Sequence, residues 1–304
     1  MLANQYRPTK LSEVVGQQQA IEVVQSIIDK GVPRGAYLFS GTSGSGKTTC
    51  ARIVANSSDF GEVFEVNASA DNGVEGTREL KETLAKQRFS NARLCVILDE
   101  AHMYTSAAWA SLLKTIEEPE HNAVIIFCTT DPQKMPRTIT SRCVQVQFSE
   151  IPEDEIVKRL IEVIHLEREK GNEIKASKKG LQLIAQSSHG SVRRALFALE
   201  ECCGDATYEK VKTLPGIVAG AEHDAILAAI MEIEASGEQA VAEALVDYYN
   251  KSGDEALREV LTEAINKACV EQTIKPNLVE KLVDARVLMT KIPVDAAIRA
   301  ALYI

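Results

Sequence analysis

An eight-residue stretch, GTSGSGKT at positions 41–48, has the residue types and spacing needed to hold phosphate groups. It fits the pattern G-x-x-x-x-G-K-[ST] and lies between a predicted strand at 36–39 and a predicted helix at about 47–57. Its glycines would let backbone N–H groups wrap phosphate oxygens without clashes from a Cβ atom. Lys47 would reach the β- and γ-phosphates, and Thr48 would ligate Mg²⁺. The stretch therefore predicts a nucleoside triphosphate site, the alternative being a glycine-rich turn with a chance Lys-Thr pair.

Polar residues also follow two apolar strands predicted further along the chain. The stretch LCVILDE at 94–100 places Asp99 and Glu100 at a strand end, where ligands sit in open α/β sheets. Asp99 would hold Mg²⁺ directly or through water, and Glu100 would orient and deprotonate the attacking water. A helix N-cap is the alternative role for this acid pair. Thr130 follows the apolar strand 124–128 and would touch the γ-phosphate or the water, unless its hydroxyl only satisfies its own turn.

Short apolar runs alternate with helical patterns through the first half of the chain. Strands are expected at 36–39, 63–66, 94–98, 124–128 and 144–148, and helices at 17–30, 47–57, 75–87 and 106–118. This alternation predicts an α/β fold with a parallel sheet covered by helices on both faces. Beyond Phe148 the periodicity is almost only helical. Helices are expected there at about 153–170, 177–187 and 191–202, then a break at 213–216 and four or five further helices.

Composition indicates a reduced, intracellular protein. The 304 residues include seven cysteines but no C-x-x-C pair, so we expect buried free thiols rather than a zinc site. The sequence has no apolar run of about 18 residues, and its N-terminus lacks the apolar core of a signal peptide. The net charge of −9 belongs mostly to the C-terminal third, so nucleic-acid binding would need a local basic face.

Seven stretches of the chain, in the family's order, resemble the ATPase subunits of sliding-clamp loaders, a branch of the AAA+ family. They are QYRPTKLSEVVGQ (5–17), AYLFSGTSGSGKT (36–48), EVNASADNG (65–73), VILDEAHM (96–103), LLKTIEEP (112–119), TTDPQKMPRTITSRC (129–143) and GSVRRAL (190–196). TTDPQKMP and SRC are close to diagnostic of this branch. The chain looks like both the gamma/tau subunit of bacterial DNA polymerase III and the small subunits of replication factor C.

The resemblance implies three domains. These would be an AAA+ nucleotide-binding domain at 1–150, a helical lid at 151–213 and a helical collar that joins subunits at 214–304. The bacterial gamma subunit carries a four-cysteine zinc insert after its first P-loop helix, whereas residues 56–64 here run directly to the next strand. A long tau-like tail is also missing from this sequence. Both features make the chain look viral or similar to the replication factor C type.

The resemblance also assigns nucleotide contacts. It implies that Tyr6, Arg7, Val14, Val15 and Gly16 frame the adenine. Arg193 in GSVRR would read the γ-phosphate of its own chain. Arg142 in TSRC would act in trans, reaching the γ-phosphate on a neighbouring subunit, and its alternative role is to cap a nearby helix C-terminus. The phosphate-loop contacts would come from Gly41, Thr42, Ser43, Gly44, Ser45, Gly46, Lys47, Thr48 and Thr49.

By the same resemblance, the chain is expected to be an ATPase subunit that uses ATP and Mg²⁺ to open and load a sliding clamp onto primer–template DNA, with hydrolysis releasing the clamp. Its partners would be other copies of itself, distinct clamp-loader subunits, the clamp and DNA, in a bacterial or host cytoplasm and at the nucleoid. DNA contacts are expected from Arg78, Lys81, Lys86 and Arg88, for which an ordinary solvated helix face is the alternative.

Two rival functions stay open. One is another AAA+ DNA motor, such as a branch-migration helicase, against which TTDPQKMP and the single helical collar argue. The other is a non-catalytic, structural clamp-loader subunit. Such subunits usually have a damaged P-loop, whereas Lys47, Thr48, Asp99 and Glu100 are all present here.

Overall fold

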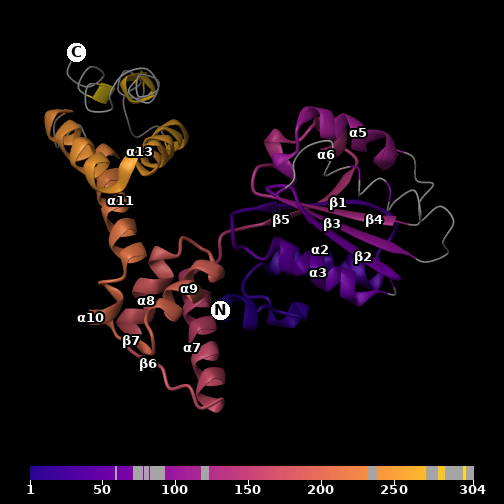
Figure 1. The fold of residues 1–304 in the computed structure, drawn as a ribbon, viewed down its shortest axis with the longest axis horizontal. Coiled ribbons are helices and arrows are strands. Elements are labelled where there is room, and N and C mark those ends of the chain that lie inside the picture. The colour runs from indigo at the N-terminus through magenta and orange to yellow at the C-terminus, as the bar shows by residue number, and fades with distance from the viewer. Residues whose placement is uncertain are drawn as a thin grey trace. The chain divides into compact units, whose positions relative to one another are not determined.

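The chain forms two compact units, Met1–Val211 and Lys212–Ile304. The computed structural model describes residues 1–58, 60–70, 78, 82, 93–117, 123–231, 238–271, 280–284 and 297–298. Figure 1 shows the sheet and its helices in the first unit and helices in the second. Within the described residues, no helix is both long and apolar enough to cross a bilayer. The division into three domains at 150 and 213 stays a prediction.

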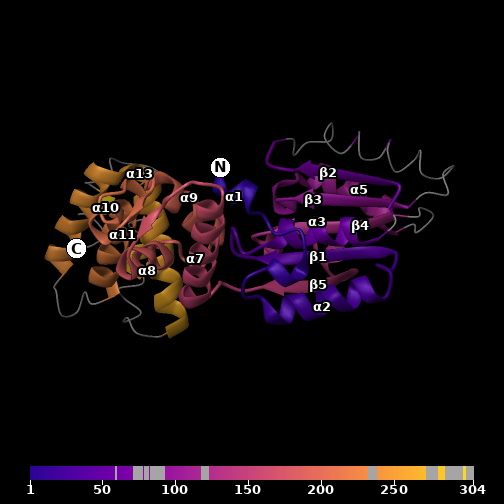
Figure 2. The same cartoon turned by 90° about the horizontal axis from the view of Figure 1, so that it is seen from below.

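A five-stranded parallel sheet organises the first unit. Its strands are β1 (Gly35–Gly41), β2 (Glu62–Asn67), β3 (Leu94–Asp99), β4 (Ala123–Thr129) and β5 (Cys143–Phe148). They lie in the order β2-β3-β4-β1-β5, so β4 separates the strand before the phosphate loop from the strand that ends in Asp99 (Figure 2). Because all neighbours are parallel, the carboxyl ends of β1, β3 and β4 meet at one edge. That edge is where the predicted phosphate and metal ligands gather.

Helices cover both faces of this sheet, as the alternating pattern predicts. Helices α2 (Gln18–Asp29) and α3 (Lys47–Ser57) lie on one face, and α5 (Ser106–Glu117) and α6 (Arg137–Thr140) lie on the other (Figure 1). Alternate residues of each strand point to opposite faces, so Phe39 and Ile97 join the core under α2 and α3. Leu38 and Leu98 join the core around α5. Short helices α1 (Leu2–Gln5), η1 (Leu11–Glu13), η2 (Ala101–Met103) and η3 (Pro132–Lys134) connect these elements.

Four helices complete the first unit after β5. They are α7 (Glu153–Glu169), α8 (Lys178–Ser187), α9 (Val192–Glu201) and α10 (Tyr208–Val211), with two-residue strands β6 (Lys175–Ala176) and β7 (Asp205–Ala206) between them. The first turn of α7 carries three acidic residues. Their negative charges interact favourably with the unpaired N–H groups at the start of a helix. Ser177 and Ser191 cap α8 and α9 by accepting hydrogen bonds from Gly180 N and Arg194 N at 3.0 and 3.3 Å. We call α7–α10 the lid helices.

The second unit is mainly helical in the residues that the structure describes. Helix α11 (Pro215–Met231) begins at a proline, which is well placed in a first turn because its missing N–H needs no partner there. Helix α13 (Glu238–Glu271) breaks at Gly253, whose φ is 87°. The two helices share a core that includes Ile230, Leu245 and Leu261. The helical pattern predicted beyond the break at 213–216 is therefore confirmed for these residues.

Candidate nucleotide site

The loop between β1 and α3 adopts a backbone that only glycine tolerates at two of its positions. Gly41 has a φ of 150° and Gly44 a φ of 76°. A Cβ atom on Gly41 would strike the backbone carbonyl of Phe148, and one on Gly44 would strike the Ser191 hydroxyl at the start of α9. The loop therefore lies tightly between the edge strand β5 and the start of α9.

Lys47 is folded back into this loop. Its Nζ donates hydrogen bonds to the carbonyl oxygens of Gly41 at 2.9 Å and Thr42 at 2.7 Å. Only 5% of the residue is exposed. Burial lowers the pKa of the Lys47 ammonium, while the nearby carboxylates of Glu100 and Asp99 act in the opposite direction. A phosphate in the loop would be a stronger partner for this ammonium than two neutral carbonyls.

Thr48 and Asp99 face each other across the edge of the sheet. Thr48 Oγ1 lies 3.0 Å from both Asp99 Oδ1 and Asp99 Oδ2. The two residues are 51 positions apart in the chain, and the order of the strands brings them together. A hydroxyl and a carboxylate are the oxygen ligands that Mg²⁺ prefers. These two side chains therefore fit a magnesium ion whose other ligands would be phosphate and water.

Glu100 stands beside this pair in an unusual backbone conformation. Its φ of 49° lies in the left-handed region, which is uncommon for a residue with a side chain. Its Oε2 lies 3.5 Å from Thr130 Oγ1 and 3.5 Å from His102 Nδ1. His102 Nδ1 in turn lies 3.0 Å from the buried Thr129 hydroxyl. The structure thus brings Glu100 and Thr130 together, and it adds His102, which the sequence analysis did not select.

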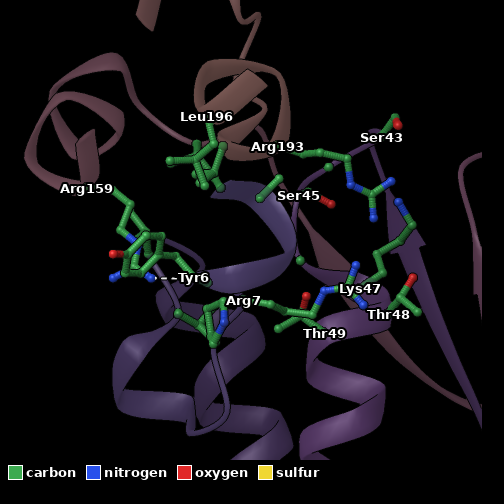
Figure 3. A pocket seen from close by; sticks show the side chains of 18 of the residues that line it. Tyr6, Arg7, Ser43, Ser45, Lys47, Thr48, Thr49, Arg159, Arg193 and Leu196 are labelled. Carbon is green, nitrogen blue, oxygen red and sulfur yellow. Dashed lines mark hydrogen bonds between the residues drawn. The ribbon is translucent and has the colours of Figure 1, made fainter. Parts of the chain in front are cut away.

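A single cleft contains most of the predicted nucleotide residues (Figure 3). Its volume is about 840 Å³ when the part open to solvent is included. The predicted residues that line it are Tyr6, Arg7, Val14, Val15, Ser43, Gly44, Ser45, Gly46, Lys47, Thr48, Thr49, Asp99, Glu100 and Arg193. Gly16, Gly41, Thr42, Thr130 and Arg142 are predicted site residues outside that lining. Residues that line it without having been predicted are Ala3, Pro8, Ile151, Arg159, Val192 and Leu196.

One part of the cleft has apolar walls, which are formed by Val14, Val15, Ile151 and Leu196. Gln17 fixes the Val14–Gly16 segment, because its side-chain amide donates to Ser149 O at 2.5 Å and accepts from Ser149 N at 2.9 Å. Ser149 begins the connection from β5 to the lid helices. The apolar wall is therefore tied to the point where the chain leaves the sheet.

Two arginines enter the cleft from the lid helices. Arg193, near the start of α9, projects towards the loop that carries Ser43 and Lys47 (Figure 3). Arg159 of α7 is buried, and its Nη2 donates to the Tyr6 carbonyl oxygen at 2.7 Å. The interpretation of Arg193 as a γ-phosphate ligand stays a prediction, which its position supports. No sequence pattern distinguished Arg159 from the other charged residues of its helix.

Arg142 lies far from the phosphate loop of its own chain. It immediately precedes β5, whose first residue pairs with Ala36 of the parallel strand β1. The phosphate loop follows the other end of β1, at Gly41. Strand geometry separates these two ends by about 17 Å. Arg142 is exposed, and its Nη1 donates to Thr138 O at 2.6 Å, which is the helix-capping contact that formed the alternative interpretation.

The predicted DNA-contact residues are described only in part. Arg78 is exposed, and its Nε lies 3.1 Å from Glu82 Oε1, one helical turn away. Lys81, Lys86 and Arg88 lie outside the described residues, as does most of the helix expected at 75–87. A DNA-binding role for these four residues stays a prediction.

The fold and the cleft define a P-loop protein with the AAA+ architecture. A solved structure of similar fold is the Thermotoga maritima RuvB Holliday junction branch migration motor, with a TM-score of 0.58 over 81% of this chain and 86% of that one, at 18% identity. That likeness concerns the fold alone. The family model described as "DNA polymerase III, delta subunit" matches residues 56–152.

Similarity in sequence identifies the family more closely than the fold does. The gamma/tau subunit of DNA polymerase III from Mycoplasma pneumoniae is 37% identical over 224 residues, covering 66% of this chain and 32% of the relative. The tau subunit of DNA polymerase III from Escherichia coli is 29% identical over 273 residues, covering 80% of this chain and 41% of the relative. This chain therefore spans about a third to two fifths of their length. The resemblance to clamp-loader subunits of the AAA+ family is confirmed.

Proposed function

We propose that this chain is an ATPase subunit of a DNA sliding-clamp loader. The pairing of Thr48 with Asp99 at 3.0 Å, beside Lys47, carries the proposal. Together these side chains would supply two oxygen ligands for magnesium and a cation for phosphate at one edge of the sheet. A subunit that cannot hydrolyse ATP because its P-loop is damaged would lack one of these groups.

Hydrolysis would use the residues that surround this pair. Lys47 would leave the loop carbonyls and bind the β- and γ-phosphates, and Thr48 and Asp99 would hold Mg²⁺. The bound ion would neutralise phosphate charge as the phosphoryl bond breaks. Glu100 would orient and deprotonate the attacking water, with Thr130 at 3.5 Å fixing its carboxylate. Arg193 would contact the γ-phosphate from α9.

The base would occupy the apolar end of the cleft. With the phosphates at Gly44–Thr48, the base would pack against the apolar side chains of Val14, Val15, Ile151 and Leu196, which line the same cleft. Tyr6, Arg7 and Gly16 would complete this end. The match between an apolar wall and an aromatic base supports ATP as the ligand, in agreement with the motifs.

Arg142 would complete the site of a neighbouring subunit. The register of β1 and β5 puts it at the sheet edge opposite its own phosphate loop, which supports action on another chain. A planar, permanently charged guanidinium suits the charge that develops on a transferring phosphoryl group. The chain would therefore assemble with copies of itself and with distinct clamp-loader subunits, through the predicted helical collar among other contacts.

Clamp and DNA would control this assembly. ATP binding would order the subunits to hold an open clamp, primer–template DNA would trigger hydrolysis, and hydrolysis would release the clamp. Arg78, Lys81, Lys86 and Arg88 are the proposed DNA contacts. The protein would act in the cytoplasm and at the nucleoid, where its DNA lies.

The test is the ATPase rate of the reconstituted assembly with and without its ligands. We expect a low rate for the isolated chain and a higher one when clamp and primer–template DNA are both present, because neighbouring subunits complete the site. The DNA-dependent part should weaken steeply with salt, since phosphate contacts release counterions. A rate indifferent to both ligands would point to another AAA+ class, such as a branch-migration motor.

One observation favours a second candidate, a structural subunit that does not hydrolyse ATP. The family model that matches residues 56–152 is described as a delta subunit of DNA polymerase III. Lys47 and Thr48 precede this segment, so the match leaves the phosphate loop out. An assembly whose ATPase and clamp loading are unchanged when this chain carries Lys47→Ala would support the structural role.

A further inference from the structure

The N-terminal wall of the cleft is attached to the lid helices. Leu2 N donates to Glu200 Oε2 of α9 at 3.2 Å. Arg159 of α7 donates to the Tyr6 carbonyl at 2.7 Å, and Figure 3 shows the two residues side by side. The wall formed by Ala3, Tyr6 and Pro8 is therefore bound to the same group of helices that carries Arg193.

Glu167 of α7 is the centre of the contacts that hold this wall. It is only 6% exposed. Its carboxylate accepts hydrogen bonds from the Tyr6 hydroxyl at 2.5 Å, Gln5 Nε2 at 3.0 Å and Asn172 Nδ2 at 2.7 Å. A buried carboxylate keeps its charge only when it is hydrogen-bonded and paired in this way. The Tyr6 bond, followed by the Asn172 bond, lowers the pKa of Glu167, so the group is ionised at neutral pH.

Lys170, which directly follows the last residue of α7, completes the arrangement. Its Nζ lies 3.6 Å from Glu167 Oε1 and donates to the Tyr6 hydroxyl at 2.7 Å. The same ammonium stands over the Tyr6 ring at 4.4 Å from the centroid. The hydroxyl of Tyr6 thus accepts from a cation and donates to an anion, which fixes both the position and the orientation of its ring.

We infer that Glu167 is a positioning residue for the base of the bound nucleotide. Glu167 and Lys170 do not line the cleft, whereas Tyr6 does. Glu167 therefore acts through Tyr6, setting where the base-side wall stands relative to α7 and α9. Arg193 belongs to α9, one of the same lid helices. A movement of the lid helices would therefore shift both Tyr6 at the base and Arg193 at the γ-phosphate. The inference rests on the proposed function and identifies what holds the base-side wall of its site in position.

The experiment compares a complete nucleotide with its phosphates alone. Binding of ADP and of inorganic triphosphate to the full chain is measured by calorimetry for the wild type, Glu167→Gln and Glu169→Gln. Glu169 lies two residues away on the same helix, is exposed, and undergoes the same chemical change. We expect Glu167→Gln to weaken ADP about tenfold, the value of one charge-assisted hydrogen bond, and to leave triphosphate unchanged. Glu169→Gln should bind both ligands as the wild type does.

A second variant tests the same interaction in case Glu167→Gln disturbs folding. Tyr6→Phe keeps the ring and removes only the hydroxyl, so it should also weaken ADP and spare triphosphate. Because both changes remove one interaction, the double variant should lose little more than either single one. Equal weakening of both ligands, or no weakening of ADP in either variant, would overturn the inference. A wild-type chain that binds neither ligand would instead contradict the proposed function itself.

Discussion

The two ends of the cleft are built in different ways. The phosphate end consists of one continuous loop, residues 41–48, and of the residues that follow two neighbouring strands. The base end combines the N-terminal segment, the Val14–Gln17 segment, Ile151 and two lid helices. Backbone geometry fixes the first end, whereas side-chain contacts between distant segments fix the second. Removing a single charged group should therefore abolish phosphate binding. Binding of the base should weaken when the side-chain contacts that position the base end are removed.

The largest expected effect comes from the phosphate end. Lys47→Ala should abolish ATP binding, because it removes the cation that we propose to bind the β- and γ-phosphates. Equilibrium binding of labelled ATP measures this directly. Lys30→Ala, at the exposed end of α2, is a matched control and should bind normally. ATP binding of wild-type affinity by the Lys47 variant would show that the loop is not a phosphate site.

Arg142 tests whether the site extends beyond one chain. Arg142→Ala should leave ATP affinity of its own subunit nearly intact, since the guanidinium lies at the opposite sheet edge. Hydrolysis in the assembly should fall by roughly 10³-fold or more, the scale of an arginine finger. Rates and affinities measured on the same reconstituted assembly separate the two effects. A rate close to that of the wild type would favour the capping contact with Thr138 as the role of Arg142.

Assemblies that mix two variants test whether Arg142 acts on a neighbouring chain. An intact phosphate loop meets an intact Arg142 only where a Lys47→Ala chain donates its arginine to an Arg142→Ala chain. Mixing the two inactive variants should therefore restore part of the activity. If mixed complexes form, as native mass spectrometry would show, and no activity returns, Arg142 acts within its own chain or structurally.

Glu100 separates binding from chemistry at the phosphate end. Glu100→Gln should bind ATP and still hold the clamp, because it removes a base but no phosphate ligand. Hydrolysis should slow by about 10²-fold or more, the usual contribution of a general base. Single-turnover hydrolysis and clamp retention are the measurements. Turnover at the wild-type rate would exclude Glu100 as the group that activates water.

The same contrast explains what the sequence could predict. The strands and helices of residues 1–202 lie close to their predicted bounds where described, since hydrophobic periodicity is a local property. Lys47, Thr48 and Asp99 could be proposed as ligands because their motifs have fixed spacing, and the structure brings Thr48 and Asp99 together. Arg159 and Glu167 were missed because they lie among many charged residues of α7, and only the folded N-terminal segment distinguishes them. Strands β6 and β7 have two residues each, too few to show a period.

The smallest expected effect concerns the supports of the base end and appears as a dependence of stability on pH. The pKa of Glu167 is lowered from its ordinary value of 4.5 in the folded chain, chiefly by the Tyr6 hydroxyl. Ionised Glu167 therefore favours the folded state above pH 4.5, and this stabilisation is lost as the pH falls through the lowered value. The pKa of Lys170 is raised, mainly by its hydrogen bond to Tyr6, so its contribution is present below its ordinary value of 10.5.

Near pH 7, Glu167→Gln should consequently melt about 2–4 °C below the wild type, the equivalent of about 1 kcal/mol in a domain of this size. The gap should close as the pH is lowered below 4.5, because protonation then removes the same charge from the wild type. Thermal melts of both proteins from pH 3 to pH 8 test this, with Glu169→Gln as the exposed control that should follow the wild type throughout. A gap that stays constant across the range would mean that packing, rather than the charge of Glu167, holds the N-terminal segment on α7.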